Sequence, residues 1–273
     1  MPGRIGVCSW SLSPGSPAEL VEGLGRAGMD AVQLALDPIR KGEWGERETI
    51  AAFCDAGIDI LSGMMAMAGE DYSTLESIRR TGGVRLDEYW EANLAAAGEN
   101  AALAERLGVG LVTFHAGFIP DDPTDPKRDL MVDRLGQIID RFADRGVSAA
   151  FETGQETAET LLGALDEIDR PTLGVNFDPA NMILYGMGDP VRAIELLAPR
   201  VSQVHIKDAV ATNEPGTWGT EVRAGTGQVD WPRFFDVLRS RNVRCDLLIE
   251  REAGVDRAED IKAAHELVAS MLK

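Results

Sequence analysis

Histidine and basic residues are scarce in this 273-residue chain. Only three histidines are present, and 27 basic residues stand against 45 acidic ones, which gives a formal net charge of −18 at pH 7. A field of this sign repels phosphate backbones and anionic lipid at long range. We therefore expect neither nucleic acid nor a membrane as a partner, although a local lysine or arginine could still hold a small phosphorylated substrate.

Cysteine is also scarce, and long apolar runs are missing. Cys8, Cys54 and Cys245 are an odd, widely spaced set, which predicts reduced thiols, as in the cytosol, instead of a disulfide framework. No apolar run approaches the roughly 18 residues of a membrane span. The stretch MPGRIGVCSWSLSPG has no basic segment followed by an apolar one of signal-peptide length. These absences predict a soluble, cytoplasmic protein.

Short apolar runs alternate with longer amphipathic stretches along the chain. The strand candidates are residues 4–10, 31–36, 58–65, 110–116, 147–152, 172–178, 201–207 and 245–250. Between them, apolar residues recur every three or four positions, as on a helix with one buried face, at residues 16–28, 86–108, 129–146 and 256–273. Several helical stretches end in a glycine just before the next strand, as in RAGMDAVQLAL and RLGVGLVTF.

Eight strand–helix units in strict alternation predict an α/β fold, a (β/α)8 TIM barrel. An open doubly wound sheet fits the alternation but rarely needs eight units. The length matches the roughly 250 residues typical of such a barrel, so we expect a single domain over residues 1–273. The Pro- and Gly-rich stretches 67–85, 117–128 and 208–230 follow strand ends, where the loops of a barrel build the active site.

Four consecutive strand candidates carry metal-binding residues at their ends. Glu152 ends AAFE, Asp178 ends VNFD, His205 lies in QVHIK, and Glu250 ends LLIE. Three carboxylates that converge at one end of a barrel repel one another unless a cation lies between them. The set therefore predicts one divalent metal ion, with Mn²⁺, Mg²⁺ or Co²⁺ favoured over Zn²⁺ because three of the four ligands are oxygens.

Each of these residues also has a simpler explanation when it is taken alone. Glu152 could cap the next helix, Asp178 could form an Asx turn, His205 could be a hydrogen-bonded core histidine, and Glu250 could pair with Arg251. Strand ends on this face are where barrel enzymes place their chemistry, so the coincidence of four favours the metal centre.

The four motifs, the segment RAGTGQVDW at residues 223–231 and the eight-unit layout resemble the sugar phosphate isomerase/epimerase family, the xylose isomerase-like TIM barrels. The resemblance covers essentially the whole chain, and the family includes ketose 3-epimerases, inosose dehydratase, hydroxypyruvate isomerase and an apurinic endonuclease branch. It implies that Glu152, Asp178, His205 and Glu250 are metal ligands and that Glu152 and Glu250 are also the catalytic acid and base. The endonuclease branch needs a cluster of histidines and a surface that approaches DNA, so three histidines and the negative charge argue against it.

Two positions depart from the epimerase branch of this family. A histidine usually follows the strand-six aspartate by three positions there, whereas this chain has Asn181. Asn181 can hydrogen-bond a substrate hydroxyl or carbonyl but cannot titrate. The arginine that the branch has shortly after the strand-seven histidine is absent from DAVATN, residues 208–213. Both differences weaken an assignment as a ketose 3-epimerase.

Four further residues near the strand ends are candidates for substrate binding. His115 is either a substrate contact or a buried, hydrogen-bonded histidine. Lys207 shares its side of the strand with His205, so it could bind a substrate oxygen or pair with a ligand carboxylate. Trp10 offers an aromatic face to a sugar, with packing at the barrel mouth as the alternative. Arg223 is a candidate anion contact.

The predicted site is suited to removal of a sugar proton α to a carbonyl. A carboxylate takes the proton, and a divalent ion stabilises the enediolate that forms. We predict a divalent-metal-dependent isomerase or epimerase of a ketose or sugar phosphate, with a keto-sugar or keto-inositol dehydratase or lyase as the alternative. A non-catalytic sugar-binding barrel is a further alternative, which Asn181 favours and the intact Glu152 and Glu250 disfavour. The outer helices of a barrel are compatible with a homo-oligomer.

Overall fold

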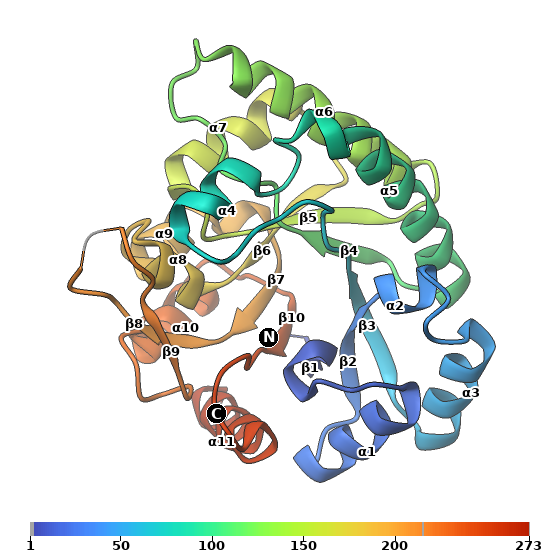
Figure 1. Cartoon of the computed structure of the whole chain (residues 1–273). Coiled ribbons are helices and arrows are strands. Elements are labelled where there is room, and N and C mark those ends of the chain that lie inside the picture. The colour runs from blue at the N-terminus through green and yellow to red at the C-terminus, as the bar shows by residue number, and fades with distance from the viewer. Residues whose placement is uncertain (1–2, 215, 273) are drawn as a thin grey trace.

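The computed structural model describes residues 3–214 and 216–272. In these ranges the chain forms a closed parallel barrel of eight strands inside a ring of helices (Figure 1). The predicted (β/α)8 TIM barrel is therefore confirmed, and an open sheet is excluded because the first and last barrel strands pair, Val7 with Ile249. The prediction of one domain over residues 1–273 also includes residues 1, 2, 215 and 273, which lie outside the described residues.

The barrel strands all fall within the predicted runs, in the order β1-β10-β7-β6-β5-β4-β3-β2. β1 stops at Cys8, earlier than expected, because a 3-10 helix, η1 (Ser9–Leu12), follows it. The strands are β1 (Ile5–Cys8), β2 (Ala31–Ala35), β3 (Asp59–Met64), β4 (Leu111–Phe114), β5 (Ser148–Glu152), β6 (Leu173–Phe177), β7 (Val201–Ile206) and β10 (Asp246–Ile249).

The helices surround the barrel, and the predicted glycine stops are present. Gly28, Gly57 and Gly108 end three helices with φ of 70°, 67° and 69°, a left-handed conformation that favours glycine. The helices are α1 (Pro17–Ala27), α2 (Asp37–Arg40), α3 (Glu46–Ala56), α4 (Leu75–Thr81), α5 (Asp87–Leu107), α6 (Pro126–Ala143), α7 (Ala158–Ile168), α8 (Pro179–Tyr185), α9 (Pro190–Leu197), η2 (Ala198–Arg200), α10 (Trp231–Ser240) and α11 (Arg257–Met271).

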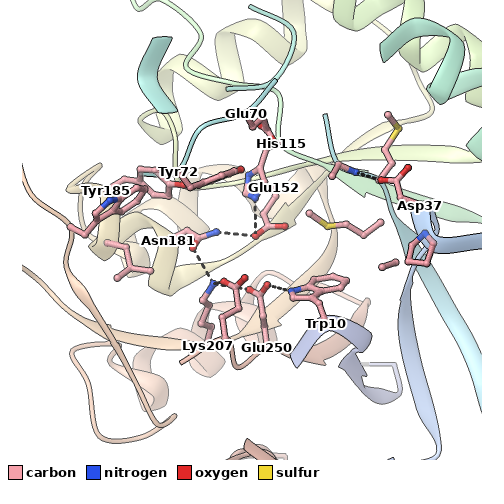
Figure 2. A pocket seen from close by; sticks show the side chains of 18 of the residues that line it. Trp10, Asp37, Glu70, Tyr72, His115, Glu152, Asn181, Tyr185, Lys207 and Glu250 are labelled. Carbon is pink, nitrogen blue, oxygen red and sulfur yellow. Dashed lines mark hydrogen bonds and ion pairs between the residues drawn. The ribbon is translucent and has the colours of Figure 1, made fainter. Parts of the chain in front are cut away.

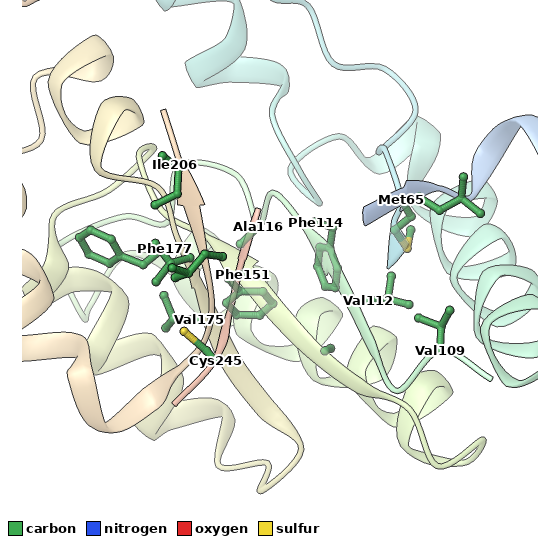
Figure 3. Close-up of a cluster of buried hydrophobic side chains, with 14 of the residues drawn as sticks. Met65, Val109, Val112, Phe114, Ala116, Phe151, Val175, Phe177, Ile206 and Cys245 are labelled. Atoms are coloured by element: carbon green, nitrogen blue, oxygen red, sulfur yellow. The ribbon is translucent and has the colours of Figure 1, made fainter. Parts of the chain in front are cut away.

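Aromatic side chains fill the layer between the strands and the outer helices. The rings of Phe114 and Phe151, on β4 and β5, lie 5.3 Å apart, and Phe177 of β6 lies 5.7 Å from Phe234 of α10 (Figure 3). Successive residues of a strand point to opposite faces. Because Phe151 and Phe177 point outward into the helix layer, the residues that follow them, Glu152 and Asp178, point into the barrel mouth.

Two loops predicted from their proline and glycine content contain short regular elements. Stretch 208–230 includes the antiparallel strands β8 (Asp208–Val210) and β9 (Thr220–Val222), and stretch 67–85 includes α4. Three-residue strands are too short to show a period of two, so the sequence pattern could not reveal them. Among the helices of the described residues, none has both the length and the apolar character needed to cross a membrane.

Candidate active site

The carboxyl ends of four barrel strands bring four buried side chains together. Glu152, Asp178, His205 and Glu250 each offer a ligand atom, and these atoms lie within 4.8 Å of one another. Nδ1 of His205 lies 3.5 Å from Oε1 of Glu152, 3.8 Å from Oδ2 of Asp178 and 3.3 Å from Oε2 of Glu250. The structure thus places the four predicted ligands around one point.

The two oxygens of Asp178 have different surroundings. Oδ1 accepts hydrogen bonds from the backbone N–H groups of Ala180, at 2.8 Å, and Asn181, at 3.0 Å, and so caps α8. Oδ2 is buried and has no hydrogen-bond partner among the described residues. The turn considered from the sequence is therefore present but uses only one oxygen. A buried oxygen without a donor is costly, and a cation at the centre of the cluster would satisfy it.

A glutamine fixes which nitrogen of His205 faces the carboxylates. Nε2 lies 2.7 Å from Oε1 of Gln33, an acceptor, and 3.0 Å from the amide nitrogen of Asn176. The shorter contact, to Gln33, is a hydrogen bond when Nε2 carries the hydrogen and donates it. Nδ1 is buried, faces the three carboxylates and has no hydrogen-bond partner among the described residues. A histidine that binds a metal through one ring nitrogen commonly donates the N–H of the other to an oxygen of the protein, as His205 does to Gln33, and the donor set fits a divalent ion.

Burial and neighbouring charges shift the pKa values of the cluster in different directions. Burial raises the pKa of Asp178 to about 6, against the charge of Lys207. Burial also disfavours charge on Glu250, but Lys207 and His205 hold its pKa well below the ordinary range. Burial alone would lower the pKa of His205, yet the thiol and carboxylates around it raise the pKa well above its ordinary value. The cluster therefore favours a positive charge at its centre, which a divalent cation supplies in place of a proton.

A cavity of about 620 Å³ opens over the cluster. Trp10, His115, Asn181 and Lys207, all predicted to bind substrate, line it (Figure 2). Arg223 is exposed and does not belong to this lining. Its predicted role as an anion contact is therefore not favoured by its position.

Trp10 and Lys207 both hold the carboxylate of Glu250. The indole N–H of Trp10 donates to Oε1 at 2.6 Å, and the ammonium group of Lys207 donates to Oε2 at 3.0 Å. Lys207 also donates to Oε2 of Glu252 at 2.7 Å. Of the roles considered for Lys207, pairing with a ligand carboxylate is the one that the contacts show. Both oxygens of Glu250 are thereby oriented before any substrate enters.

Asn181 and His115 lie on the other side of the cluster, against Glu152. The side-chain amide of Asn181 donates to Oε1 of Glu152 at 2.8 Å, and Nε2 of His115 lies 3.8 Å from the same oxygen. Nδ1 of His115 is buried and has no partner among the described residues. His115 is thus not the fully hydrogen-bonded core histidine that was one alternative, and its position in the cavity wall suits a substrate contact.

A buried polar layer that the sequence reasoning missed lies beneath the cluster. Gln203 donates to Asn176 at 3.1 Å, and Gln33 donates to Thr113 at 2.8 Å. Asn176 lies two residues before Asp178, and Gln203 two before His205, so each shares a strand face with a ligand. Polar residues at these spacings inside apolar strands were the signal that could have revealed the layer.

The RAGTGQVDW segment is held by one buried carboxylate, Asp208. Oδ2 of Asp208 accepts from the backbone of Gly225 and Gly227, at 2.9 and 3.1 Å, and from the indole of Trp231 at 3.1 Å. Oδ1 accepts from the backbone of Val229 at 3.1 Å. A Cβ at Gly227 would lie 2.2 Å from Oδ1, so glycine is required there. The glycines of this segment therefore wrap a carboxylate of the protein itself.

Comparison with protein families gives a match over most of the chain. The model described as "Xylose isomerase-like TIM barrel" matches residues 21–271. A solved xylose isomerase domain protein from Planctomyces limnophilus is 33% identical, with a TM-score of 0.84, and the match covers 92% of this chain and 91% of that one. D-allulose 3-epimerase from Methylomonas sp., solved with D-allulose, has a TM-score of 0.72 at 16% identity, covering 98% and 96%, which shows a shared fold.

A curated relative carries a different activity in its name. The 3-oxo-isoapionate decarboxylase of Pectobacterium atrosepticum is 27% identical over 153 residues, which are 52% of this chain and 55% of the relative. The chain spans about half the length of the curated relatives it matches. The curated relative is thus named as a decarboxylase, and a structure with the same fold is named as an epimerase.

Proposed function

Since this chain belongs to the xylose isomerase-like TIM barrel family, we propose that it is a divalent-metal-dependent sugar isomerase or epimerase. The observation that carries the proposal is the buried cluster of Glu152, Asp178, His205 and Glu250. One oxygen and one nitrogen of this cluster have no partner among the described residues, and Glu152 and Glu250 line the cavity of about 620 Å³ next to them. We place this activity on a small-molecule sugar in the cytoplasm.

The four residues would hold one divalent ion, Mn²⁺, Mg²⁺ or Co²⁺ in preference to Zn²⁺, because three ligands are carboxylates. When bound, such an ion polarises a sugar carbonyl and stabilises the enediolate that forms when the neighbouring carbon loses its proton. Gln33 keeps His205 in the tautomer that can act as a ligand.

Glu152 and Glu250 are the proposed proton carriers, and the protein orients them by different means. Neutral amide groups hold Glu152, with Asn181 at 2.8 Å and Asn176 at 3.3 Å. A cation, Lys207, and the indole of Trp10 hold Glu250. Charge pairing makes Glu250 the weaker base of the two, so we assign proton abstraction to Glu152. In an isomerisation Glu152 returns the same proton to the neighbouring carbon, whereas in an epimerisation the opposite face receives its proton from Glu250, which must then enter the reaction protonated.

Asn181 limits what the second proton transfer can be. In place of an imidazole it presents a neutral amide, which can bind a substrate hydroxyl but cannot donate a proton to it as an acid. Residue 181 therefore supplies no acid, and we assign the proton transfers to Glu152 and Glu250. Elimination of a hydroxyl on the same site is the second candidate, which the ammonium group of Lys207 at 3.0 Å from Glu250 favours, because a cation there can stabilise a departing oxygen.

Metal analysis followed by isotope exchange tests this function. Purified protein should contain near-stoichiometric divalent metal by mass spectrometry, and it should exchange the α-proton of a ketose with solvent deuterium, read by NMR. Epimer or isomer products support the first candidate, whereas a dehydrated diketo product supports the second. Retention of metal without exchange on any ketose or keto-inositol would leave only a sugar-binding barrel.

A further inference from the structure

The charged groups that line the cavity are mostly carboxylates. Two lysines line it, and no arginine occurs among the described residues of its wall. The acidic residues of the wall are Asp37, Glu43, Glu70, Glu152, Glu250 and Glu252.

The buried cation of the cavity wall, Lys207, and the neighbouring Arg40 already have acidic partners. Lys207 is only 4% exposed and is held between Glu250, at 3.0 Å, and Glu252, at 2.7 Å. Arg40, outside the wall, pairs with Asp37 at 2.8 Å. Lys41 is exposed at the rim. A phosphate or carboxylate group of a substrate would therefore be repelled by the carboxylates of the wall, and no unpaired buried cation of the described wall would offset this repulsion. A divalent ion would not offset it either, because its charge is balanced by its three carboxylate ligands.

The wall away from Glu250 offers groups that recognise hydroxyls. Glu70 and Tyr72 lie there near His115, and Tyr185 lies beyond Tyr72 (Figure 2). Oε1 of Glu70 accepts the backbone N–H of Gly83 at 2.9 Å, which holds the carboxyl in place. The ring of Tyr72 lies 6.5 Å from that of His115. Carboxyl and phenol groups exchange hydrogen bonds with sugar hydroxyls, and aromatic faces pack on sugar C–H groups.

Resting on the proposed function, we infer that the substrate is an uncharged, polyhydroxylated sugar whose hydroxyls at the end remote from the metal ligands contact Glu70, Tyr72 and Tyr185. Sugar phosphates and sugar acids are excluded by the charge of the wall. The metal ligands bind the reacting end, and this second wall selects the substrate class.

Binding of polyols tests the inference without requiring turnover. Calorimetry in excess MnCl₂ compares xylitol, ribitol, sorbitol and mannitol with the terminal phosphate of each. We expect at least one neutral polyol to bind about tenfold or more tightly than its phosphate, because like charges in a desolvated site repel strongly. Tighter binding of the phosphates, or no binding of any neutral polyol, would overturn the inference.

A substitution at the wall tests the role of Glu70 itself. Glu70→Gln keeps an acceptor for Gly83 but removes the charge, so the affinity ratio of neutral polyol to phosphate should fall about threefold or more. Glu88→Gln, on the exposed face of α5, is the matched control and should leave the ratio unchanged. If the substitution only disturbed the structure of the wall, the affinities for the neutral polyol and for its phosphate would fall together. An unchanged affinity ratio in Glu70→Gln would therefore refute the role of Glu70 in selecting uncharged substrates.

Failure of the proposed function has a different outcome. In that case neutral polyols still bind more tightly than their phosphates, but no ketose exchanges its α-proton. If instead ketose phosphates exchange faster than free ketoses, the function stands and the inference about charge falls.

Discussion

Asp178 and Asp208 are two buried aspartates at neighbouring strand ends with opposite surroundings. Both are no more than 1% exposed, and both accept backbone N–H groups. Both oxygens of Asp208 have donors, whereas Oδ2 of Asp178 has none within residues 3–214 and 216–272. A buried carboxylate with all its donors supplied by the protein organises a loop, and one with a free oxygen is available to a cation. On this face of the barrel, Asp208 therefore holds a loop in place, whereas Asp178 has an oxygen available for a cation.

Replacing Asp178 should have the largest effect, on metal binding and activity, and should leave the stability of the fold nearly unchanged. Asp178→Asn keeps an N-cap for α8 but offers the centre a neutral amide in place of a carboxylate. We expect loss of bound metal and a fall in kcat/KM of about a thousandfold or more, with little change in the unfolding of the metal-free protein. Metal analysis, kinetics and urea denaturation check this.

Asp189 provides the matched control, because it caps α9 before Pro190 in the same way. Its Oδ1 accepts from Val191 at 2.7 Å and Arg192 at 3.1 Å. Asp189→Asn should keep both metal and activity. Equal losses in the two variants would mean that capping, not the free oxygen, explains Asp178.

Replacing Asp208 should have the opposite result, a loss of stability without a loss of metal. Asp208→Asn presents an N–H group to donors that need an acceptor, so the free energy of unfolding should fall by about 3 kcal/mol. Metal content per folded molecule should stay unchanged. Urea denaturation of the metal-free protein measures the loss, with Asp230→Asn at the exposed cap of α10 as the control. Loss of metal from folded Asp208→Asn would remove the distinction between the two aspartates.

Glu156, just after β5, is a third buried carboxyl that can be compared with Asp178 and Asp208, and no charged partner in the described part of the chain offsets the cost of its burial. It is 6% exposed, Oε1 has no partner among the described residues, and burial raises its pKa to about 8. The folded chain then holds a proton that the unfolded chain releases above about pH 4.5, so stability should fall as pH rises from there to about 8.

Glu156→Gln should remove much of this pH dependence and raise stability at pH 9 by about 2 kcal/mol. Denaturation from pH 5 to pH 9 measures it, and Glu195→Gln on the exposed side of α9 should follow the wild type. Parallel curves for wild type and Glu156→Gln would show that Glu156 is ionised in the folded protein.

The smallest expected effect concerns protons at the metal ligands. The pKa of Asp178 is raised to about 6 and that of His205 lies well above its ordinary value. A metal ion must displace these protons, so its affinity should fall about tenfold per pH unit for each proton displaced, below pH 6 for Asp178 and already at higher pH for His205. Calorimetric titration with MnCl₂ between pH 5 and pH 7.5 checks this. An affinity independent of pH would mean that the ligands are already deprotonated.

The sequence predicted the barrel and the four convergent residues because both follow from strong local patterns. Alternation of strand and helix defines the fold, and Glu152 or Glu250 after an apolar strand is visible without tertiary structure. The wall residues Glu70 and Tyr72 were not predicted, because they lie in a loop whose path depends on contacts such as the Gly83–Glu70 hydrogen bond. The position of Arg223 likewise depended on a loop that folds around Asp208, away from the cavity.

The hydrogen bond from Trp10 to Glu250 joins residues 240 positions apart, at the seam where the first and last barrel strands pair. A chain emerging from the ribosome holds Trp10 almost from the start but cannot complete this contact until nearly all of it has been made. Glu250 thus receives its indole donor only as the barrel closes. A chain that ends before β10 lacks the last barrel strand and Glu250, so we expect such a truncated product to lack the proposed activity.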